Sequence, residues 1–403
     1  MSHKGWIESV VAETVKTNGL HGEYSVKIHG DVAKSDHFAS DMTFVEVFQK
    51  NHREKPIFNL ILKYIPLNPE FKEKLTFVTK LFRTEIDVYT KIIPRYQKLQ
   101  KERSLSLLDF VPKCYYTRET DSDEVLALEN IKPYGFQLHP KEVKMDQAHI
   151  RLVLNRLAQW HALSFSLKDR YFEEFKKLHE NHKVSVWKTV FDSHVGKIIE
   201  YSHKSLYKIL EETGQIEILN KFKANCKCLD SKDIIYSLIN EDKDEKHAVL
   251  IHGDCWNSNF MFQYKDEDHS QPTKIQLLDF QVSSLRSPII DVSQFIYTTA
   301  SAEELKNIKA HLTYYYNELS KYIEALGSDP QELFTPKDFQ EQWHKYSAHG
   351  VLIGLIAPIF IHLNSVSLEN ETVILELLPK MVAKPEFIKR VTDIAKCFAT
   401  FEF

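Results

Sequence analysis

Apolar and polar positions in the first 130 residues alternate in blocks that predict strands separated by one long helix. Residues 42–48, 57–65 and 125–129 are rich in β-branched or aliphatic side chains, and each segment predicts a β-strand. Between Asn68 and Pro94 the apolar residues recur every three or four positions, which predicts a helix. This part of the chain is therefore expected to be a small mixed unit, followed by a turn at residues 132–135.

From about residue 146 the pattern becomes mostly helical, beginning with a helix expected over residues 148–167. A compact island of strand-like segments interrupts it between residues 247 and 280, and helical patterns then resume to the C-terminus. The sequence therefore predicts an α+β fold with two parts. A small mixed lobe is expected over residues 1–131, and a larger, mainly helical lobe over residues 132–403.

One face of the predicted long helix carries a charged residue among apolar ones. Spacings of four and three place Glu85 on one stripe with Phe71, Leu75, Val78, Phe82, Tyr89 and Ile92. A carboxylate on a buried stripe is costly unless a cation meets it. Lys63 ends an otherwise apolar strand pattern and is the natural partner of Glu85. The alternative is that both side chains reach solvent at the edge of the lobe.

The strand-rich island carries the strongest chemical pattern. A short apolar strand leads to Asp254, Asn259 opens a second strand, and the returning strand ends at Asp279, so a hairpin would bring Asn259 near Asp279. Kinase-type phosphoryl transfer needs an Asp that accepts a hydrogen bond from the attacking hydroxyl, and Asn and Asp oxygens as ligands for Mg²⁺. A lysine held by a helix glutamate positions the phosphates, and Lys63 and Glu85 supply that pair. The pattern predicts Mg²⁺-dependent phosphoryl transfer.

Each residue of the island also has a structural interpretation. Asp254 would cap the following turn, and Asn259 would hold a tight bend. His252 is expected to be a hydrogen-bonding residue beneath the loop. A hydrolytic metal site made of His252, Asp254 and Asp279 is a further alternative, but no second histidine lies at ligand spacing.

Composition and charge narrow the expected partners and compartment. The net charge is −4, so binding to nucleic acid or to an anionic membrane surface is not expected. The first residues contain no apolar signal-peptide core, and the five cysteines form no zinc-type set of pairs, which favours a cytoplasmic protein. Residues 346–368 carry no Asp, Glu, Lys or Arg, but their apolar centre is short and includes Pro358. This predicts a buried helix that bends or ends there rather than a membrane span.

The island and several other segments resemble a known family. His252-Gly-Asp-Cys-Trp-x-x-Asn259, followed by Leu278-Asp-Phe-Gln281, is similar to motifs of the ecdysteroid-kinase-like family of insects. These proteins are also described as CHK kinase-like or juvenile-hormone-inducible proteins, and are relatives of choline kinases and aminoglycoside phosphotransferases. Matches extend along nearly the whole chain: the lysine strand at 58–66, the glutamate helix at 82–94, the adenine hinge at 126–130, and segments 160–164 and 287–291.

The resemblance implies a bilobal protein-kinase-like fold, whose N-lobe has an antiparallel sheet and one long helix. It also implies phosphorylation of a small-molecule hydroxyl group by Mg-ATP. Asp254 would be the catalytic base, and Asn259 and Asp279 would bind Mg²⁺. Asp291 would brace the catalytic loop. The residues implied for ATP binding are Lys63, Glu85, Ser40, and the hinge residues Glu129, Asn130 and Ile131.

One segment departs from the family pattern. The turn that covers the phosphates usually contains glycine, whereas residues 35–40 read Ser-Asp-His-Phe-Ala-Ser, and no glycine lies between Gly30 and Gly135. Glycine best allows a backbone to approach phosphate, although Ser40 keeps a hydroxyl for that purpose. The implied acceptor is an ecdysteroid or a similar hydroxylated dietary metabolite, and the protein is expected to be a monomer. The alternative is a catalytically weak or inactive kinase-like protein that binds a small hydrophobic ligand or a partner.

Overall fold

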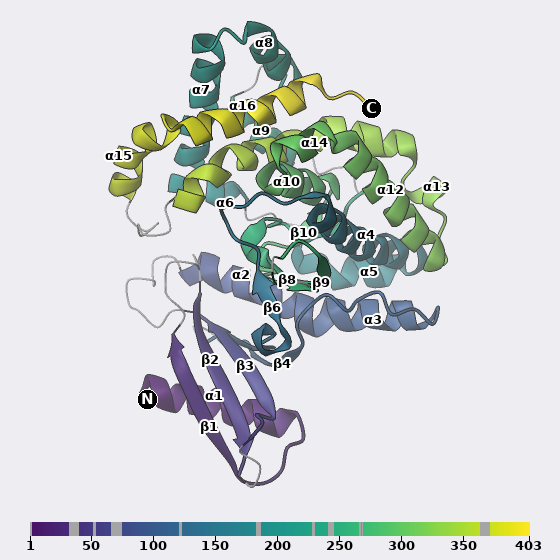
Figure 1. Ribbon diagram of the computed structural model, residues 1–403. Helices are drawn as coiled ribbons and strands as arrows, with labels where there is room; N and C mark the ends of the chain where they lie inside the picture. The colour runs from purple at the N-terminus through teal and green to yellow at the C-terminus, as the bar shows by residue number, and fades with distance from the viewer. Residues whose placement is uncertain are drawn as a thin grey trace.

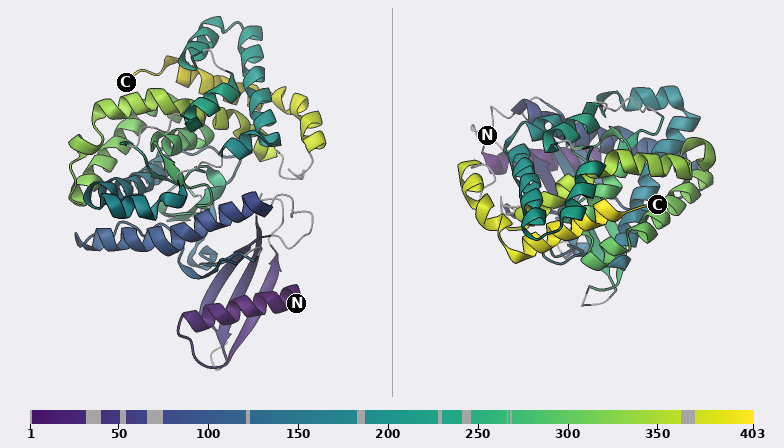
Figure 2. Two further views of the ribbon diagram at one scale, coloured as in Figure 1. Left: turned by 180° about the vertical axis from the view of Figure 1, so that it is seen from behind. Right: turned by 90° about the horizontal axis from the view of Figure 1, so that it is seen from above.

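The computed structural model has two lobes, a small one built on a β-sheet and a larger helical one (Figure 1). It describes residues 2–31, 40–50, 54–65, 75–120, 123–182, 187–227, 230–240, 246–265, 267, 269–362 and 371–403. Helices α2 (Leu75–Asp87) and α3 (Ile93–Lys101) run across the junction between the lobes, as the views from the front and from behind show (Figures 1 and 2). The predicted α+β arrangement of a small mixed lobe and a larger helical lobe is confirmed.

Five antiparallel strands form the sheet of the small lobe, in the order β1-β2-β3-β5-β4. Their bounds are β1 Tyr24–Asp31, β2 Asp41–Gln49, β3 Phe58–Tyr64, β4 Cys114–Arg118 and β5 Val125–Glu129. The three predicted strands are confirmed as β2, β3 and β5. Strands β1 and β4 and helix α1 (His3–Thr17) were not predicted from the sequence. Helix α1 covers one face of the sheet through a cluster of buried residues: Ile7, Val10, Val11, Val15, Val45, Val47, Leu60 and Leu62.

The helix that carries Glu85 is longer than the sequence pattern predicts. Helix α2 continues through a π-helical turn, η3 (Val88–Ile92), into α3. The expected end near Pro94 is wrong: Pro94 lies just after the π-helical turn, as the second residue of α3, and the helix continues past it to Lys101. Phe71 lies outside the described residues, and the members of the predicted stripe whose side chains are buried are Val78, Phe82, Glu85, Tyr89 and Ile92.

Helix α4 (Gln147–Arg170) opens the larger lobe and confirms the helix predicted over residues 148–167. Its N-cap is Asp146, whose Oδ1 accepts a hydrogen bond from the His149 N–H. The other helices described in this lobe are α5 (Phe172–Leu178), α6 (Trp187–Phe191), α7 (His194–Glu212), α8 (Ile216–Asn225), α9 (Ser231–Asn240), α10 (Ile289–Thr299), α11 (Ala302–Lys306), α12 (Ile308–Ala325), α13 (Pro330–Leu333), α14 (Pro336–His362), α15 (Glu371–Val382) and α16 (Pro385–Thr400).

Helix α10 is buried along its whole length and packs closely against α14. Two glycines of α14 permit this close approach. A Cβ atom at Gly350 would lie 2.2 Å from the Ser293 carbonyl carbon, and one at Gly354 would lie 2.9 Å from the Tyr297 carbonyl oxygen. Because the two glycines are four residues apart, they lie on one face of α14. The contact brings α14 side chains within reach of α10.

Residues 351–361 lie in α14 and are buried or half-buried, as predicted for this apolar segment. The helix does not end at Pro358, however, but continues to His362. No helix in the described part of the chain combines the length and apolarity needed to cross a membrane.

The strand-rich island is confirmed. Strands β8 (Phe260–Tyr264) and β9 (Pro272–Leu277) form the predicted hairpin, in which Phe260 pairs with Leu277. The remaining strands and turns are β6 (Phe136–Leu138), which pairs with β8, β7 (Val249–Ile251), which pairs with β10 (Ser284–Arg286), and the 3₁₀ turns η4 (Lys132–Tyr134), η5 (Glu180–His182) and η6 (Asn257–Asn259).

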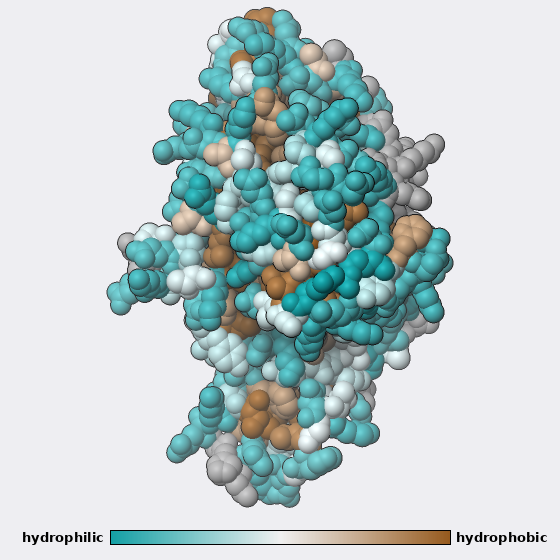
Figure 3. All heavy atoms as spheres, turned by 90° about the vertical axis from the view of Figure 1, so that its right-hand side faces the viewer, coloured by the Kyte–Doolittle hydropathy of each residue, from teal (hydrophilic) through white to brown (hydrophobic). Residues whose placement is uncertain are grey.

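The surface of the molecule is mainly hydrophilic on the face drawn in Figure 3, where apolar side chains gather in small separate groups. Among the described residues, the large apolar side chains that are strongly exposed come from well-separated elements: Tyr134, Leu138, Val143, Phe172, Ile216 and Leu375. The described residues therefore form no broad apolar patch on this face.

Buried histidines make the stability of the fold sensitive to acid. Burial lowers the pKa of His139, His203 and His349 to about 4, and that of His179 to about 3. An unfolded histidine has a pKa of about 6.5, so between pH 6.5 and 4 the unfolded chain binds more protons than the folded one. The stability that these neutral rings contribute is therefore present above pH 6.5 and is lost as the pH falls toward 4.

We expect His203→Phe to reduce this acid sensitivity. His203 packs against the rings of Tyr207 and Phe222, at 4.6 and 6.0 Å, so phenylalanine keeps the aromatic contact and removes the titrating group. The free energy of unfolding, from urea titrations at pH 7 and pH 5, should fall about 2 kcal/mol less in the variant than in the wild type. Equal losses in both proteins would show that His203 is protonated in the folded state.

Candidate active site

Lys63 joins the small lobe to the hairpin of the larger one. Its Nζ lies 2.6 Å from Glu85 Oε2 on α2 and 2.8 Å from Asp279 Oδ1, which follows β9. Lys63 is 5% exposed and Glu85 is 1% exposed. The side chain of Asp279 is 23% exposed. The alternative in which Lys63 and Glu85 both reach solvent is therefore wrong.

The charges of this group depend on one another. Burial alone would lower the pKa of Lys63, but the carboxylates of Asp279 and Glu85 outweigh it and hold that pKa above its ordinary value. Burial also raises the pKa of Glu85, while the Lys63 charge opposes the shift. Lys63 therefore stays protonated at neutral pH, and its cation is fixed at the junction of the lobes.

Asp254 lies in the loop after β7 and keeps some exposure to solvent. Its Oδ2 accepts a hydrogen bond from Asn259 Nδ2 at 2.8 Å, and its Oδ1 accepts one from Gln294 Nε2 at 3.2 Å. Burial of the carboxylate, followed by the charge of Asp279, raises the pKa of Asp254 to about 7, although both hydrogen bonds lower it. The carboxyl group therefore exchanges a proton near neutral pH, which suits a general base.

Asp291, in the first turn of α10, fixes the backbone of this loop. Its Oδ2 accepts from the His252 N–H at 2.7 Å, and its Oδ1 accepts from the Gly253 N–H at 2.8 Å. Burial would raise the pKa of Asp291, but the contacts with the loop and with His161, whose Nε2 lies 3.1 Å from the same carboxylate, together outweigh it, so that pKa is below its ordinary value. Gly253 has a φ of +88°, and a Cβ there would lie 2.5 Å from the Val282 carbonyl oxygen. Only glycine fits this position.

His252 uses both ring nitrogens within the protein. Nε2 lies 2.8 Å from the Leu278 carbonyl oxygen, and Nδ1 accepts a hydrogen bond from the Asp254 N–H at 3.3 Å. This pattern requires a neutral ring, and burial lowers the pKa of His252 accordingly. The described residues contain no cluster of three or more His, Cys, Asp or Glu side chains arranged to hold a metal ion. The geometry supports the structural interpretation of His252 over the hydrolytic metal site.

The hairpin brings Asn259 and Asp279 together, because the Leu278 N–H donates to the Asn259 carbonyl oxygen at 2.9 Å. Asp279 has a φ of +66°, in the left-handed region that non-glycine residues seldom occupy. The next residue, Phe280, is fully buried against the rings of Trp160 and His252, with centroids 5.0 and 4.7 Å away. This anchor holds the strained backbone in place, so that the Asp279 carboxylate faces Lys63.

The predicted hinge lies between β5 and η4. The Glu129 N–H donates to the Lys113 carbonyl oxygen at 2.8 Å, and the Asn130 N–H donates to the Asn59 carbonyl oxygen at 2.9 Å. Among the three predicted hinge residues, Ile131 is the one whose N–H makes no backbone hydrogen bond within the described part of the chain. The hinge backbone is thus held by the hydrogen bonds of Glu129 and Asn130, and the Ile131 N–H remains as a donor.

Of the predicted phosphate-covering turn, residues 35–39 lie outside the described residues. Ser40 is described and is buried. It directly precedes β2, in which Met42 pairs with Lys63 of β3. The structure therefore brings Ser40 close to the strand that carries Lys63.

Two residues of the site were not predicted from the sequence, Gln294 and His349. Gln294 Nε2 contacts Asp254, and Gln294 Oε1 lies 3.4 Å from His349 Nε2 on α14. The only local signal for Gln294 is its position three residues after Asp291, on the same face of α10. His349 has no such signal, because its contact depends on the packing of α14 against α10.

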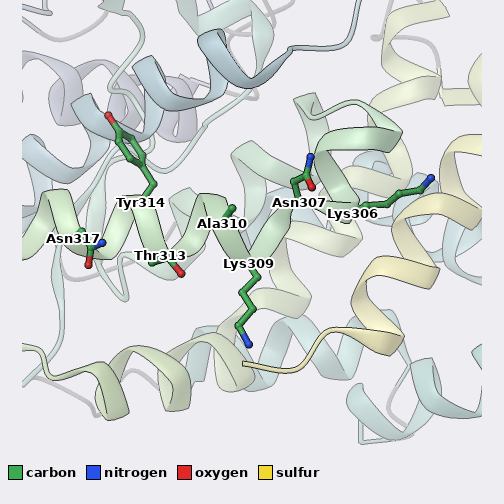
Figure 4. Close-up of a pocket in the computed structure, with 7 residues that line it drawn as sticks. All are labelled: Lys306, Asn307, Lys309, Ala310, Thr313, Tyr314 and Asn317. Atoms are coloured by element: carbon green, nitrogen blue, oxygen red, sulfur yellow. The ribbon is translucent and has the colours of Figure 1, made fainter.

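A shallow depression on the surface is formed by other residues (Figure 4). It runs along α11 and α12 and is lined by Lys306, Asn307, Lys309, Ala310, Thr313, Tyr314 and Asn317. It contains none of the predicted site residues.

The fold and the site together define a class of protein. An antiparallel sheet with a buried lysine, a glutamate helix, and a helical lobe with an Asp-Asn-Asp hairpin form the bilobal protein-kinase-like fold. The sequence profile of the ecdysteroid kinase-like family matches residues 34–328 of the 403. The chain therefore belongs to the ecdysteroid kinase-like family, a kinase-like group of small-molecule phosphotransferases.

The solved structures to which the chain is similar share little sequence with it. A mutant of aminoglycoside 2′-phosphotransferase IIIa in complex with GDP is 12% identical, with a TM-score of 0.43 over 93% of this chain and 96% of that one. A putative fructosamine-3-kinase from Haemophilus somnus is 11% identical, with a TM-score of 0.38 over 97% of each chain. A type VIII aminoglycoside-3′-phosphotransferase is 11% identical, with a TM-score of 0.31 over 88% of this chain and 100% of that one. No curated protein sequence matches the chain. The family assignment therefore rests on the sequence profile.

Proposed function

We propose that the protein is an ATP-dependent kinase that phosphorylates a hydroxyl group of an ecdysteroid or of a similar hydroxylated metabolite. One arrangement carries the proposal above all: Lys63 is buried between Glu85 and Asp279, residues 22 and 216 positions away in the chain. In kinase-type transfer the lysine contacts the nucleotide phosphates, and the aspartate binds the metal ion. The cation and the carboxylate that this reaction needs are thus already assembled.

Asn259 and Asp279 fit Mg²⁺ as its protein ligands. Mg²⁺ prefers a few hard oxygen ligands and keeps several water molecules, so an amide oxygen and a partly exposed carboxylate suffice. Because Asn259 Nδ2 donates to Asp254, the Asn259 amide oxygen is the atom that remains for a cation. When bound, Mg-ATP would supply the phosphoryl group and the positive charge that neutralises it. Lys63 would hold the α- and β-phosphates, and Glu85 would orient Lys63.

The adenine end of ATP would meet the hinge formed by Glu129, Asn130 and Ile131. Since the N–H groups of Glu129 and Asn130 already donate within the protein, Ile131 would supply the N–H for the base. Ser40 would donate its hydroxyl to a phosphate. The hinge would then separate a nucleotide-binding N-lobe, residues 1–131, from a C-lobe, residues 132–403.

Asp254 would be the catalytic base. Its carboxylate would accept a hydrogen bond from the acceptor hydroxyl and take up the proton as the new bond to phosphorus forms. With a pKa of about 7, an appreciable fraction of the group is ionised at neutral pH. Asn259, Gln294 and the backbone contacts of Asp291 would keep the loop in place during transfer.

The side chains next to Asp254 favour an uncharged acceptor. Those that come from α10 and α14 are the Gln294 amide and, behind it, the His349 ring, which is neutral because burial lowers its pKa to about 4. The ring of Trp187 packs edge-on against His349 at 4.9 Å, and Trp256 is half-buried in the same loop as Asp254. An amide, a neutral imidazole and aromatic rings suit a hydroxylated, largely apolar molecule.

Nucleotide binding separates the proposed kinase from the weak or inactive kinase-like alternative. We expect Mg-ATP to raise the melting temperature of the wild-type protein progressively with concentration, because ligand bound to the folded state stabilises it by about 2.7 kcal/mol at 100 times Kd. A thermal-shift titration measures this effect, with ATP plus EDTA as the control without metal. Absence of any shift at millimolar Mg-ATP would support the alternative.

The acceptor can be identified from the mass of the product. The protein would be incubated with Mg-ATP and a pooled extract of hydroxylated steroids and plant metabolites, with the Asp254→Asn variant as the control. We expect at least one component to gain the mass of a phosphate group with the wild-type protein only. Products confined to polycationic or choline-like compounds would contradict the uncharged acceptor.

A further inference from the structure

Helix α10 presents a second polar side chain to the loop that carries Asp254. Gln294 is fully buried and lies three residues after Asp291, so both side chains are on one helix face. Asp291 binds the loop backbone, whereas Gln294 Nε2 reaches the Asp254 carboxylate itself, at 3.2 Å from Oδ1. A buried glutamine on a central helix thus donates a hydrogen bond to the side chain proposed as the base.

His349 holds the other end of the Gln294 amide. Its Nε2 lies 3.4 Å from Gln294 Oε1, and its ring is buried against Trp187. His349 precedes Gly350, where any Cβ atom would lie 2.2 Å from the Ser293 carbonyl carbon. The close approach of α14 to α10 at this glycine is therefore what brings His349 within reach of Gln294.

Only one orientation of the Gln294 amide is consistent with both neighbours. A carboxylate accepts hydrogen bonds, so the amide nitrogen must face Asp254 and the amide oxygen must face His349. A neutral imidazole with its proton on Nε2 then donates to that oxygen. In the flipped orientation the amide oxygen would face the negatively charged carboxylate of Asp254.

We infer that Gln294, oriented by His349, is a positioning residue that sets the direction of the Asp254 carboxylate toward the acceptor hydroxyl. Asn259 holds Oδ2 and Gln294 holds Oδ1, so the carboxylate is fixed from both sides. Without such contacts the carboxylate of an aspartate can take a broad range of orientations about its terminal torsion angle. This inference rests on the proposed function, because it assigns Gln294 and His349 to the transfer step.

The inference separates two kinetic effects. Within the described residues, Gln294 forms no side-chain hydrogen bond with Lys63, Asn259 or Asp279, so its loss should leave nucleotide and metal binding intact. Misdirecting a base by about 1 Å is enough to lower a rate by about 10²-fold. The effect of losing Gln294 should therefore appear in kcat and not in the KM for ATP.

The test uses Gln294→Met, which keeps the length of the side chain and removes the amide. ADP release from Mg-ATP is followed without added acceptor, so that water takes the place of the hydroxyl, and Mg-ADP binding is followed by thermal shift. We expect kcat to fall about 10- to 100-fold, with the KM for ATP and the Mg-ADP shift within about two-fold of wild type. His349→Phe, which keeps the ring against Trp187, should lower kcat by a smaller factor. The double variant should match Gln294→Met alone.

Gln159→Met is the matched control. Gln159 is also a buried glutamine, on α4, where it accepts a hydrogen bond from Arg156 at 2.9 Å. Its side chain forms no hydrogen bond with the site in the described part of the chain, so its replacement should leave kcat unchanged. A loss of kcat common to the Gln159 and Gln294 variants would indicate a general effect of removing buried amides and would overturn the inference.

The outcomes distinguish this inference from the proposed function. If the wild-type protein neither releases ADP nor binds Mg-ADP, the proposed function fails and the inference fails with it. If the wild type is active and Gln294→Met keeps kcat within two-fold, only the inference fails. A Gln294→Met protein that loses Mg-ADP binding together with kcat would indicate a structural role and would also overturn it. If that variant does not fold, His349→Phe decides alone: a lower kcat at unchanged KM supports the inference, and an unchanged kcat overturns it.

Discussion

Replacing Asp254 with asparagine is expected to lower kcat for phosphoryl transfer by about 10²- to 10⁴-fold, the range that general bases contribute. The amide has the shape of the carboxylate but cannot take up the hydroxyl proton. Nucleotide binding should survive, because Lys63, Glu85 and Asp279 form their own group of contacts. ADP release measures the first effect, and a Mg-ATP thermal-shift titration measures the second.

Asp338→Asn provides a control for the loss of a carboxylate elsewhere. Asp338 accepts hydrogen bonds from Thr335 at the start of α14 and is partly buried, yet it makes no contact with the site. We expect its replacement to leave kcat unchanged. If Asp254→Asn kept the wild-type rate, the assignment of Asp254 as the base would be wrong.

Lys63→Met is expected to reduce both stability and turnover. It leaves the buried carboxylate of Glu85 without its cation, and breaking a buried ion pair in this way costs about 3–5 kcal/mol. It also removes the positive charge proposed for the ATP phosphates. Urea unfolding measures the first effect, and ADP release measures the second.

The double variant Lys63→Met with Glu85→Gln separates the two effects. A neutral amide at position 85 no longer needs a cation, so much of the lost stability should return while turnover stays absent. Lys389→Met is the surface control: Lys389 forms an exposed pair with Asp393 at 2.7 Å, and its loss should change stability by less than about 1 kcal/mol. Wild-type turnover in Lys63→Met would contradict the proposed nucleotide site.

Local sequence patterns predicted the elements that carry the site with useful accuracy. The strand at Val125–Glu129 has its predicted bounds, and the hairpin of β8 and β9 forms where the island predicts it. These elements follow from side-chain alternation and turn chemistry, which act over a few residues. Asn259 and Asp279 stand at the ends of the two hairpin strands, so their proximity was predictable from the hairpin alone.

Helix ends were less predictable, because prolines do not have the same effect in every helix. Pro94 lies just after the π-helical turn that joins α2 to α3, and Pro358 lies inside α14, four residues before its end. In α14 the neighbouring α10 packs along the same helix and offsets the lost hydrogen bond through buried contacts. Sequence periodicity reports which face is buried, but not how strongly the neighbours stabilise the helix.

By itself, the sequence singled out the residues proposed to carry the chemistry, which are the lysine and glutamate on apolar elements and the Asp-Asn-Asp hairpin, and it indicated the family. Only the tertiary structure decided that Lys63 also binds Asp279. The same holds for the contact of Gln294 with Asp254 and for that of His349 with Gln294. The physical reason is distance along the chain. Periodicity and turn chemistry are local, whereas these contacts join elements whose meeting depends on the docking of two lobes and on the close packing of α14 against α10 at Gly350.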